Sequence, residues 1–338
     1  MSIEIGGRRI RFGLWYDFRN PLQWRRPPAD VYGRTLEHIR FAERLNFDDI
    51  WTSEHHFIDD EYSPSLLPIC GAIAAATSRV RIGTNVLLLP LHDPVRVAED
   101  AATVDALSGG RFDLGVAIGY KLEEFAGFGV DRRTRANRME EAVAIIRRCW
   151  GEGAFTFHGK HYRYDNIDVR PKPVQQPMPL WMGGFVEPAV RRAGRLGDGF
   201  LGAANVIETF VDEWTKHHSD APERIALSLP FAAVSRDPEA TWAEIGEHVV
   251  YQRRRYGEWF GAAGMGVAAN TPATAAEMRE RTPDVVVTPG RAREIVEGIV
   301  ARLPVTHLYW WAIPPGVPAD RMWESAELFA SEMSLKDG

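Results

Sequence analysis

The chain has 338 residues, of which 45% are apolar and 25% are charged, the balance of an ordinary globular protein. Its net charge of −6 at pH 7 disfavours a nucleic-acid partner, because nucleic-acid-binding proteins usually present a basic face. No run of about 18 apolar residues occurs, so no membrane-spanning helix is expected. The length allows two domains, or one α/β barrel of roughly 250 residues with insertions.

Cysteine content and the first residues both bear on the compartment. Two cysteines, Cys70 and Cys149, are too few for a disulfide framework, and each lies in an apolar, helix-like run where a buried thiol is expected. Residues 1–11 are polar and lack the apolar segment of a secretory signal peptide. Together these features predict a cytoplasmic protein.

Short apolar runs followed by amphipathic stretches recur along the first 150 residues. Apolar residues spaced three and four apart predict helices between strands. Asp93-Pro94 supplies an N-cap and a proline at the first helical position, and Gly109-Gly110 ends that helix. Such alternation predicts parallel strands with helical crossovers. The expected strands are 11–16, 48–52, 80–89 and 111–117.

The alternation is interrupted at residues 151–178, where 155–164 predicts a hairpin and several prolines predict a stiff, extended insertion. Residues 257–284 are rich in Gly, Ala and Thr and predict a mobile loop, a candidate lid. Eight strands, each followed by a helix, predict a (β/α)8 TIM barrel formed by residues 1–338 as one domain, with insertions after the fourth strand and before the last helices. The later strands are expected at 180–182, 199–202, 225–234 and 307–313.

Chemistry in such a barrel belongs at the C-terminal ends of the strands. The second strand is followed by Glu54, His55 and His56, and then by three further carboxylates at 59–61. A neutral imidazole suits proton transfer near neutral pH. A metal site is a second interpretation, although no other cluster completes a ligand set, and a solvated acidic loop is a third.

Glycine-rich junctions follow three other predicted strands. Gly183 to Val186 leads directly into a helix, whose first N–H groups and positive dipole end favour a phosphate. The pattern is neither a P-loop nor a dinucleotide-binding fingerprint. Residues 83–86 and 117–120 offer small side chains and a backbone that a planar ligand can approach closely. Tryptophans at predicted strand positions could fill the core or line an aromatic pocket, namely Trp15, Trp51, Trp181, Trp310 and Trp311.

These residues resemble the bacterial-luciferase-like flavin-dependent oxidoreductases, over about Arg11 to Phe329. The resemblance rests on FDDIWTSEHHF (47–57), on the block 81–120, on FGV (128–130) and on PMPLWMGGFVEPAVRRAGRLGDGF (177–200). It implies a (β/α)8 barrel, usually a homodimer, that holds reduced FMN or a deazaflavin at its mouth. It implies either monooxygenation with O2 through a flavin hydroperoxide, with FMN reduced by a separate flavin reductase, or hydride transfer with the deazaflavin coenzyme F420.

The resemblance also implies roles for individual residues. His55 matches the first histidine of the family's EHHF motif, which is credited with catalysis. Residues 84–86 match the strand beneath the isoalloxazine ring, where family members often carry a non-proline cis peptide, here between Asn85 and Val86. The expected cofactor-binding residues are Thr84, Asn85, Val86, Ala117, Ile118, Gly119, Tyr120, Gly183, Gly184, Phe185 and Val186. The expected substrate pocket comprises Trp15, His56, Trp310 and Trp311.

Two positions depart from the luciferase branch. Ile118 stands where that branch has a phosphate-binding arginine, and Phe185-Val186 stands where it has Glu-Ser. Phosphate binding would then depend on backbone N–H groups and Tyr120, which keeps the deazaflavin open, whereas EHHF favours FMN.

The main expectation is therefore a monooxygenase that uses reduced FMN and O2 on an apolar or aromatic small molecule. One alternative is an F420-dependent reductase or dehydrogenase. The other is a non-catalytic flavin-binding protein, which the presence of His55 disfavours.

Overall fold

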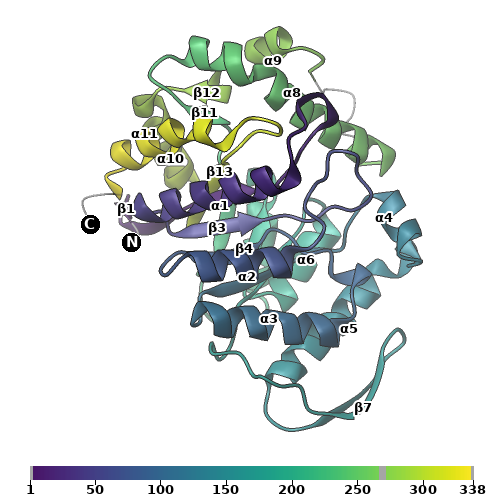
Figure 1. The fold of residues 1–338 in the computed structure, drawn as a ribbon. Helices are drawn as coiled ribbons and strands as arrows, with labels where there is room; N and C mark the ends of the chain where they lie inside the picture. The colour runs from purple at the N-terminus through teal and green to yellow at the C-terminus, as the bar shows by residue number, and fades with distance from the viewer. Residues whose placement is uncertain (1–2, 266–271, 336–338) are drawn as a thin grey trace. The chain divides into compact units, whose positions relative to one another are not determined.

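The computed structural model describes residues 3–265 and 272–335. Contacts between backbone positions divide the chain into two compact units, each of which combines segments distant in sequence (Figure 1). The first unit contains Met1–Trp51, His55–Pro64 and Ala226–Gly338. The second unit contains Thr52–Glu54 and Ser65–Ile225.

The first unit is built on parallel strands β10 (Ile225–Ser228), β13 (His307–Trp311) and β2 (Arg8–Tyr16), in that order, with β3 (Asp49–Thr52) beside β2. Strand β1 (Ile3–Ile5) forms an antiparallel hairpin with β2, and a separate parallel pair joins β11 (Ala233–Val234) to β12 (Val286–Val287). The helices of this unit are α1 (Pro28–Arg44), α8 (Pro238–Ala262), α9 (Ala275–Arg281), α10 (Pro289–Arg302) and α11 (Trp323–Glu332).

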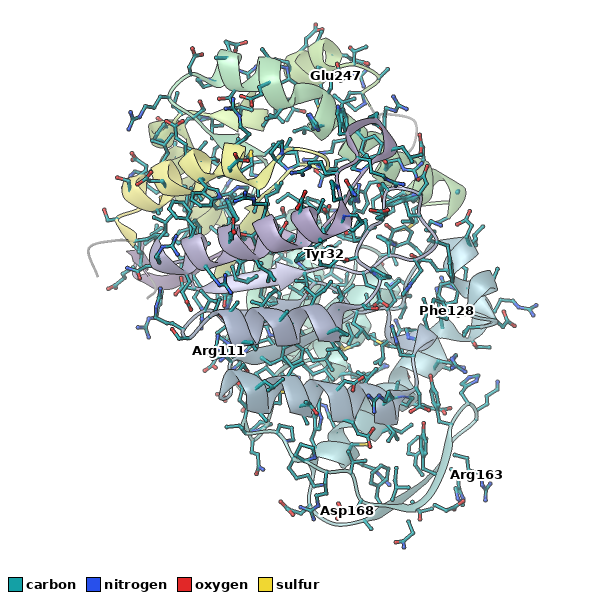
Figure 2. The ribbon with its side chains drawn as sticks, viewed as in Figure 1. Tyr32, Arg111, Phe128, Arg163, Asp168 and Glu247 are labelled. Atoms are coloured by element: carbon teal, nitrogen blue, oxygen red, sulfur yellow. The ribbon has the colours of Figure 1, made fainter. Side chains whose placement is uncertain are left out.

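The second unit has the parallel strand order β4 (Arg81–Thr84), β5 (Phe112–Val116), β8 (Leu180–Gly183) and β9 (Gly199–Gly202). A hairpin of β6 (Phe155–His158) and β7 (Arg163–Ile167) confirms the hairpin expected in the insertion; Figure 2 labels Arg163 on it and Asp168 just beyond it. The helices are α2 (Leu66–Ala76), α3 (Pro94–Ser108), α4 (Leu122–Gly127), α5 (Arg135–Trp150), α6 (Glu187–Leu196) and α7 (Ile207–Trp214).

Strands and helices alternate through the described chain as the sequence predicted. The eight strands β2, β3, β4, β5, β8, β9, β10 and β13 are those of a (β/α)8 barrel, which confirms the predicted fold class. Their residues are almost all buried, as parallel strands covered by helices require. Among the described helices, none is long and apolar enough to cross a membrane.

The segment 257–284 differs from the expected irregular loop. Helix α8 continues to Ala262, and α9 occupies Ala275–Arg281, while residues 266–271 lie outside the described part of the chain. The buried side chain of Trp259 anchors the end of α8 and outweighs the poor helix propensity of its glycines. The Thr274 hydroxyl accepts from the N–H of Glu277, a helix start that a Thr-x-x-Glu pattern signals. The lid role of this segment stays a prediction.

Two smaller boundaries also differ from the sequence expectations. The expected strand at 80–89 ends at Thr84, and the run at 225–234 contains the two separate strands β10 and β11. Both cysteines are free and buried, as expected, and burial raises the pKa of each thiol to about 12.

Candidate active site

In the second unit, the chain beyond β4 is held by backbone and hydroxyl groups. The Thr84 hydroxyl donates to the Gly115 carbonyl at 2.7 Å and accepts from the Gly115 N–H at 2.8 Å. The next peptide bond, Asn85–Val86, is cis, as the resemblance implied. The N–H of Asn85 then donates to the Thr52 carbonyl at 2.5 Å, and the N–H of Leu87 donates to Gly115 at 2.8 Å. These bonds fix the orientation of the cis peptide.

Three of the expected cofactor-binding segments meet at this point. A Cβ added to Gly183 would lie 3.0 Å from Cγ1 of Val86 and 3.4 Å from the Cβ of Ala117. The ends of β4, β5 and β8 therefore converge, and glycine keeps their backbones close. Ile118 and Tyr120 are partly exposed beside this convergence. We call the residues 84–86, 117–120 and 183 the peptide bed.

The turn from Gly183 to Val186 precedes α6, and no side chain caps that helix. Phe185 and Val186 are about half exposed, so the turn is open to an incoming group. A Cβ on Gly184 would lie 3.0 Å from the Cβ of Ala189 on α6 itself. Gly184 is thus required for packing the turn onto its own helix, and its replacement would disturb α6 before it affected a ligand.

Glu54 holds the segment that follows residues 84–86 of the peptide bed, and it was not among the predicted cofactor-binding residues. Its buried carboxylate accepts from the N–H of Leu88 at 2.6 Å and pairs with Nε2 of His92 at 2.7 Å. It therefore holds the segment that follows the cis peptide. Burial alone would lower the pKa of His92, but the charge of Glu54 and the hydrogen bond with it outweigh burial and raise that pKa.

The pairing of His92 with Glu54 predicts that the contribution of His92 to the free energy of unfolding depends on pH. Because the folded-state pKa is raised, the contribution is fully present below the unfolded value of about 6.5 and is lost as the pH rises through the folded value. His92→Gln should therefore cost about 1 kcal/mol near pH 6 and less near pH 9, measured by urea unfolding. An equal cost at the two pH values would mean that the charge on His92 contributes nothing.

In the first unit, His55 lies in an aromatic cage. Only 5% of His55 is exposed, and its ring contacts Tyr62 and Trp259 at centroid distances of 4.8 and 4.9 Å. The ring of Tyr256 lies 6.1 Å away. The N–H of His55 donates to the Ser63 carbonyl at 3.3 Å. An imidazole in these surroundings is shielded from water, as a proton-transfer group in a dry site must be.

A buried guanidinium completes the cage. The Arg19 side chain is fully buried, with Cζ 4.3 Å from the ring centroid of Tyr62, 5.0 Å from that of Tyr256 and 5.2 Å from that of Trp259. Such cation–π contacts favour the guanidinium over these rings. We call Arg19, His55, Tyr62, Tyr256 and Trp259 the aromatic cage.

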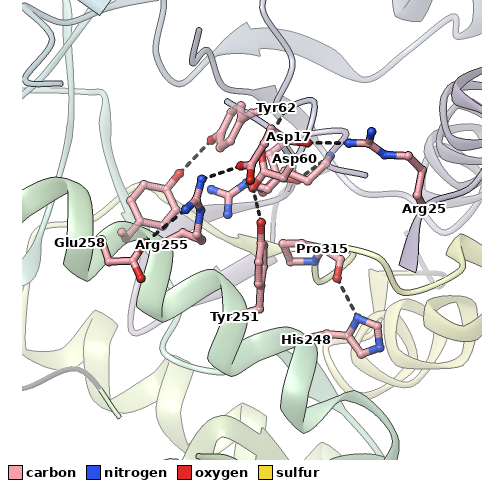
Figure 3. A network of polar contacts seen from close by, with 12 residues as sticks. Asp17, Arg25, Asp60, Tyr62, His248, Tyr251, Arg255, Glu258 and Pro315 are labelled. Carbon is pink, nitrogen blue, oxygen red and sulfur yellow. Dashed lines mark hydrogen bonds and ion pairs between the residues drawn. The ribbon is translucent and has the colours of Figure 1, made fainter. Parts of the chain in front are cut away.

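Two buried carboxylates balance this cation. Nε of Arg19 lies 3.3 Å from Asp17 and 3.8 Å from Asp60. Burial raises the pKa of Asp17, and the charge of Arg19 opposes that rise. Tyr251 points from α8 to Asp60 and donates a hydrogen bond at 3.0 Å (Figure 3). Asp60 was noticed only as part of an acidic loop, and Asp17 and Arg19 gave no signal in the sequence.

The structure does not bring together all four residues of the expected substrate pocket. Trp15 and Trp311 are paired across β2 and β13, stack at 3.8 Å and remain partly exposed. Trp310 is only 1% exposed and packs on Phe47, Phe231 and Phe329. Trp310 therefore belongs to the core, and its prediction as a substrate-pocket residue is wrong. Adjacent strand residues point to opposite faces, which separates Trp310 from Trp311. His56 is buried next to Phe57.

Comparison with known proteins identifies the family. The model of the family described as luciferase-like monooxygenase matches residues 10–302. The chain belongs to this family. Curated relatives of this chain have names that specify either a flavin-dependent or an F420-dependent enzyme.

Curated relatives include enzymes with either cofactor. An F420-dependent glucose-6-phosphate dehydrogenase from Kineococcus radiotolerans is 36% identical over 178 residues, covering 50% of this chain and 52% of that protein. The oxygenase component of a flavin-dependent trigonelline monooxygenase from Acinetobacter baylyi is 30% identical over 155 residues, covering 45% and 43%. The chain spans about half the length of the curated relatives it matches first.

Solved structures share the fold over nearly the whole chain. A monooxygenase from Streptomyces bottropensis aligns with a TM-score of 0.79 and 20% identity, covering 97% of this chain and all of that one. The oxygenating constituent of 3,6-diketocamphane monooxygenase from Pseudomonas putida, in complex with FMN, aligns with a TM-score of 0.77 and 17% identity, covering 99% of each chain. At this identity the likeness shows the luciferase-like barrel and not the substrate.

Proposed function

We propose that the protein is a monooxygenase that uses reduced FMN and O2 on an apolar or aromatic small molecule. The observation that carries the proposal is the aromatic cage, which surrounds the histidine of the EHHF motif with three rings and leaves it almost no exposure. His55 can therefore exchange a proton without contact with bulk water. This suits a flavin monooxygenase, in which water promotes side reactions.

The peptide bed and the turn before α6 fit a flavin phosphate and ring. The convergence of Val86, Ala117 and Gly183 leaves a backbone surface of small residues, and the uncapped start of α6 suits a phosphate. When bound, the flavin supplies the redox chemistry. The residues of the chain bind and orient it, Glu54 holds the segment after the cis peptide, and His55 gives and recovers a proton.

A deazaflavin-dependent dehydrogenase or reductase is the second candidate. The 36% identity to the F420-dependent dehydrogenase favours it, as does the lack of a phosphate-binding arginine at Ile118. A flavin-binding protein without catalysis is disfavoured by the buried His55.

Spectra of the purified protein decide between these candidates. The protein is mixed anaerobically with photoreduced FMN and, separately, with reduced coenzyme F420, and spectra are recorded before and after O2 is admitted. The proposal expects reduced FMN to bind and its reoxidation by O2 to differ from that of free FMN. Binding of reduced F420 alone would establish the second candidate.

A carboxylate at the start of α6 is expected to weaken FMN binding. Val186 is the N-cap residue and is about half exposed, so Val186→Asp places a negative charge where the phosphate would bind. Repulsion between like charges near a surface should lower FMN affinity at least about tenfold. Val186→Asn is the matched control, because aspartate and asparagine cap helices about equally well. Equal FMN affinity in the two variants, measured by fluorescence titration, would place the phosphate elsewhere.

A flavin reductase and a second copy of the chain are the proposed partners. The reductase follows from the two-component relative, whose printed name specifies an oxygenase component. The homodimer rests on the family resemblance, and light scattering should give twice the chain mass of 38.0 kDa. A mass near 38.0 kDa at micromolar concentration would argue against the dimer.

A further inference from the structure

The aromatic cage contains a second group that can transfer a proton. The hydroxyls of Tyr62 and Tyr256 are hydrogen-bonded to each other at 2.8 Å. Tyr62 comes from the loop after β3 and is 2% exposed, whereas Tyr256 comes from α8 and is partly exposed. Tyr256 is thus the more exposed residue of the pair.

The guanidinium of Arg19 lies beside this tyrosine pair and has N–H groups that donate no hydrogen bond to the described residues. Its Nη1 and Nη2 atoms are buried and have no hydrogen-bond partner among the described residues, and Cζ lies within 5.0 Å of both tyrosine rings. Asp17 and Asp60 already pair with Nε of this cation, which leaves Nη1 and Nη2 as donors to a further negative group. A phenolate on Tyr256 would be such a group.

We propose that Tyr256, backed by Tyr62, is a second proton donor for the reaction, and that Arg19 is a positioning residue that stabilises the phenolate formed. The proposal rests on the proposed oxidoreductase function and deepens it. The O–H bond of Tyr256 breaks, its proton passes to an oxygen atom of the reacting molecule, and the negative charge stays beside Arg19. A proton from solvent then restores the phenol.

The charges around Tyr256 determine how the pKa of its phenol should change when a neighbouring residue is replaced. Burial raises the pKa of Tyr256; Arg19 and the hydrogen bond from Tyr62 lower it, and Asp17 raises it. His55 and Arg253 are the other titratable groups that contact or interact with this phenol. Tyr256 is therefore protonated at neutral pH, as a donor must be. Arg19 and Tyr62 lower its pKa, whereas Asp17 raises it.

The cofactor-free protein tests this coupling directly. A 3-fluorotyrosine at position 256 lowers the phenol pKa into a range where its ionisation can be followed by fluorine NMR. Tyr62→Phe should move that ionisation to higher pH, and Asp17→Asn should move it to lower pH. The same probe at Tyr164, on the hairpin of the second unit, is the control and should respond to neither change. Shifts in one common direction, or none, would overturn the coupling of Tyr256 to Tyr62 and Asp17.

A second measurement tests proton donation with reduced FMN as the probe. Tyr256→Phe should slow the reoxidation of protein-bound reduced FMN by O2 about 10²-fold and reduce its solvent isotope effect, because general acid catalysis contributes that much. A rate within about threefold of the parent protein, with FMN bound equally, would overturn the proposal. If the parent protein binds neither FMN nor F420, the proposed function itself fails, and that result is seen before any variant is made.

Discussion

Replacing His55 with alanine should reduce turnover by about 10²–10⁴-fold while cofactor binding is retained, because general acid–base catalysis contributes this much. His55 contacts the three rings of the aromatic cage and has no part in the peptide bed, so its loss should leave flavin affinity unchanged. Turnover is measured at saturating flavin, together with the flavin dissociation constant.

Truncation of a buried side chain also leaves a cavity, so stability has to be measured beside activity. His38→Ala is the matched control, since His38 is a buried histidine of α1 and belongs to neither the aromatic cage nor the peptide bed. The thermal midpoints of both variants are compared with that of the parent protein. Turnover of the His55 variant within about threefold of the parent, in a folded protein, would refute the catalytic assignment.

Removing the cation of the aromatic cage should produce the largest loss of stability. Arg19→Leu leaves the carboxylates of Asp17 and Asp60 buried without their shared counter-ion. Breaking a buried ion pair from one side typically costs 3–5 kcal/mol, so a fall of about 4 kcal/mol in the free energy of unfolding is expected. Urea unfolding at about pH 7 measures it.

The pH dependence of this loss in unfolding free energy tests whether the unpaired carboxylates cause it. Burial already raises the pKa of Asp17, and without the opposing charge of Arg19 this carboxyl group is neutral over a wider acidic range. Protonation removes the unpaired charge, so the loss should be smaller at about pH 5 than at about pH 7. Arg34→Leu is the control: Arg34 forms an exposed ion pair with Glu37 at 2.8 Å, worth at most about 1 kcal/mol. A similar cost for both variants would contradict the importance of burial.

Local patterns in the sequence were sufficient for the fold class, and the family resemblance located the segments proposed for the site. The alternation of apolar runs with three- and four-residue spacing predicts eight strands and their helices, because both periodicities depend only on neighbouring residues. The EHHF segment, the cis peptide after Asn85 and the Gly183 to Val186 turn are likewise continuous stretches. The structure places each of them at the end of a strand.

Contacts between distant segments were beyond the reach of the sequence. Arg19, Tyr62 and Tyr256 are separated by up to 237 positions and carry no common motif, yet they share one buried cage. Trp310 and Trp311 are adjacent and chemically alike, but they lie on opposite faces of β13. Trp310 is therefore buried in the core, whereas Trp311 is partly exposed. Burial also decides what each ionisable group does, since a charge is tolerated only where the folded chain brings an opposite charge beside it.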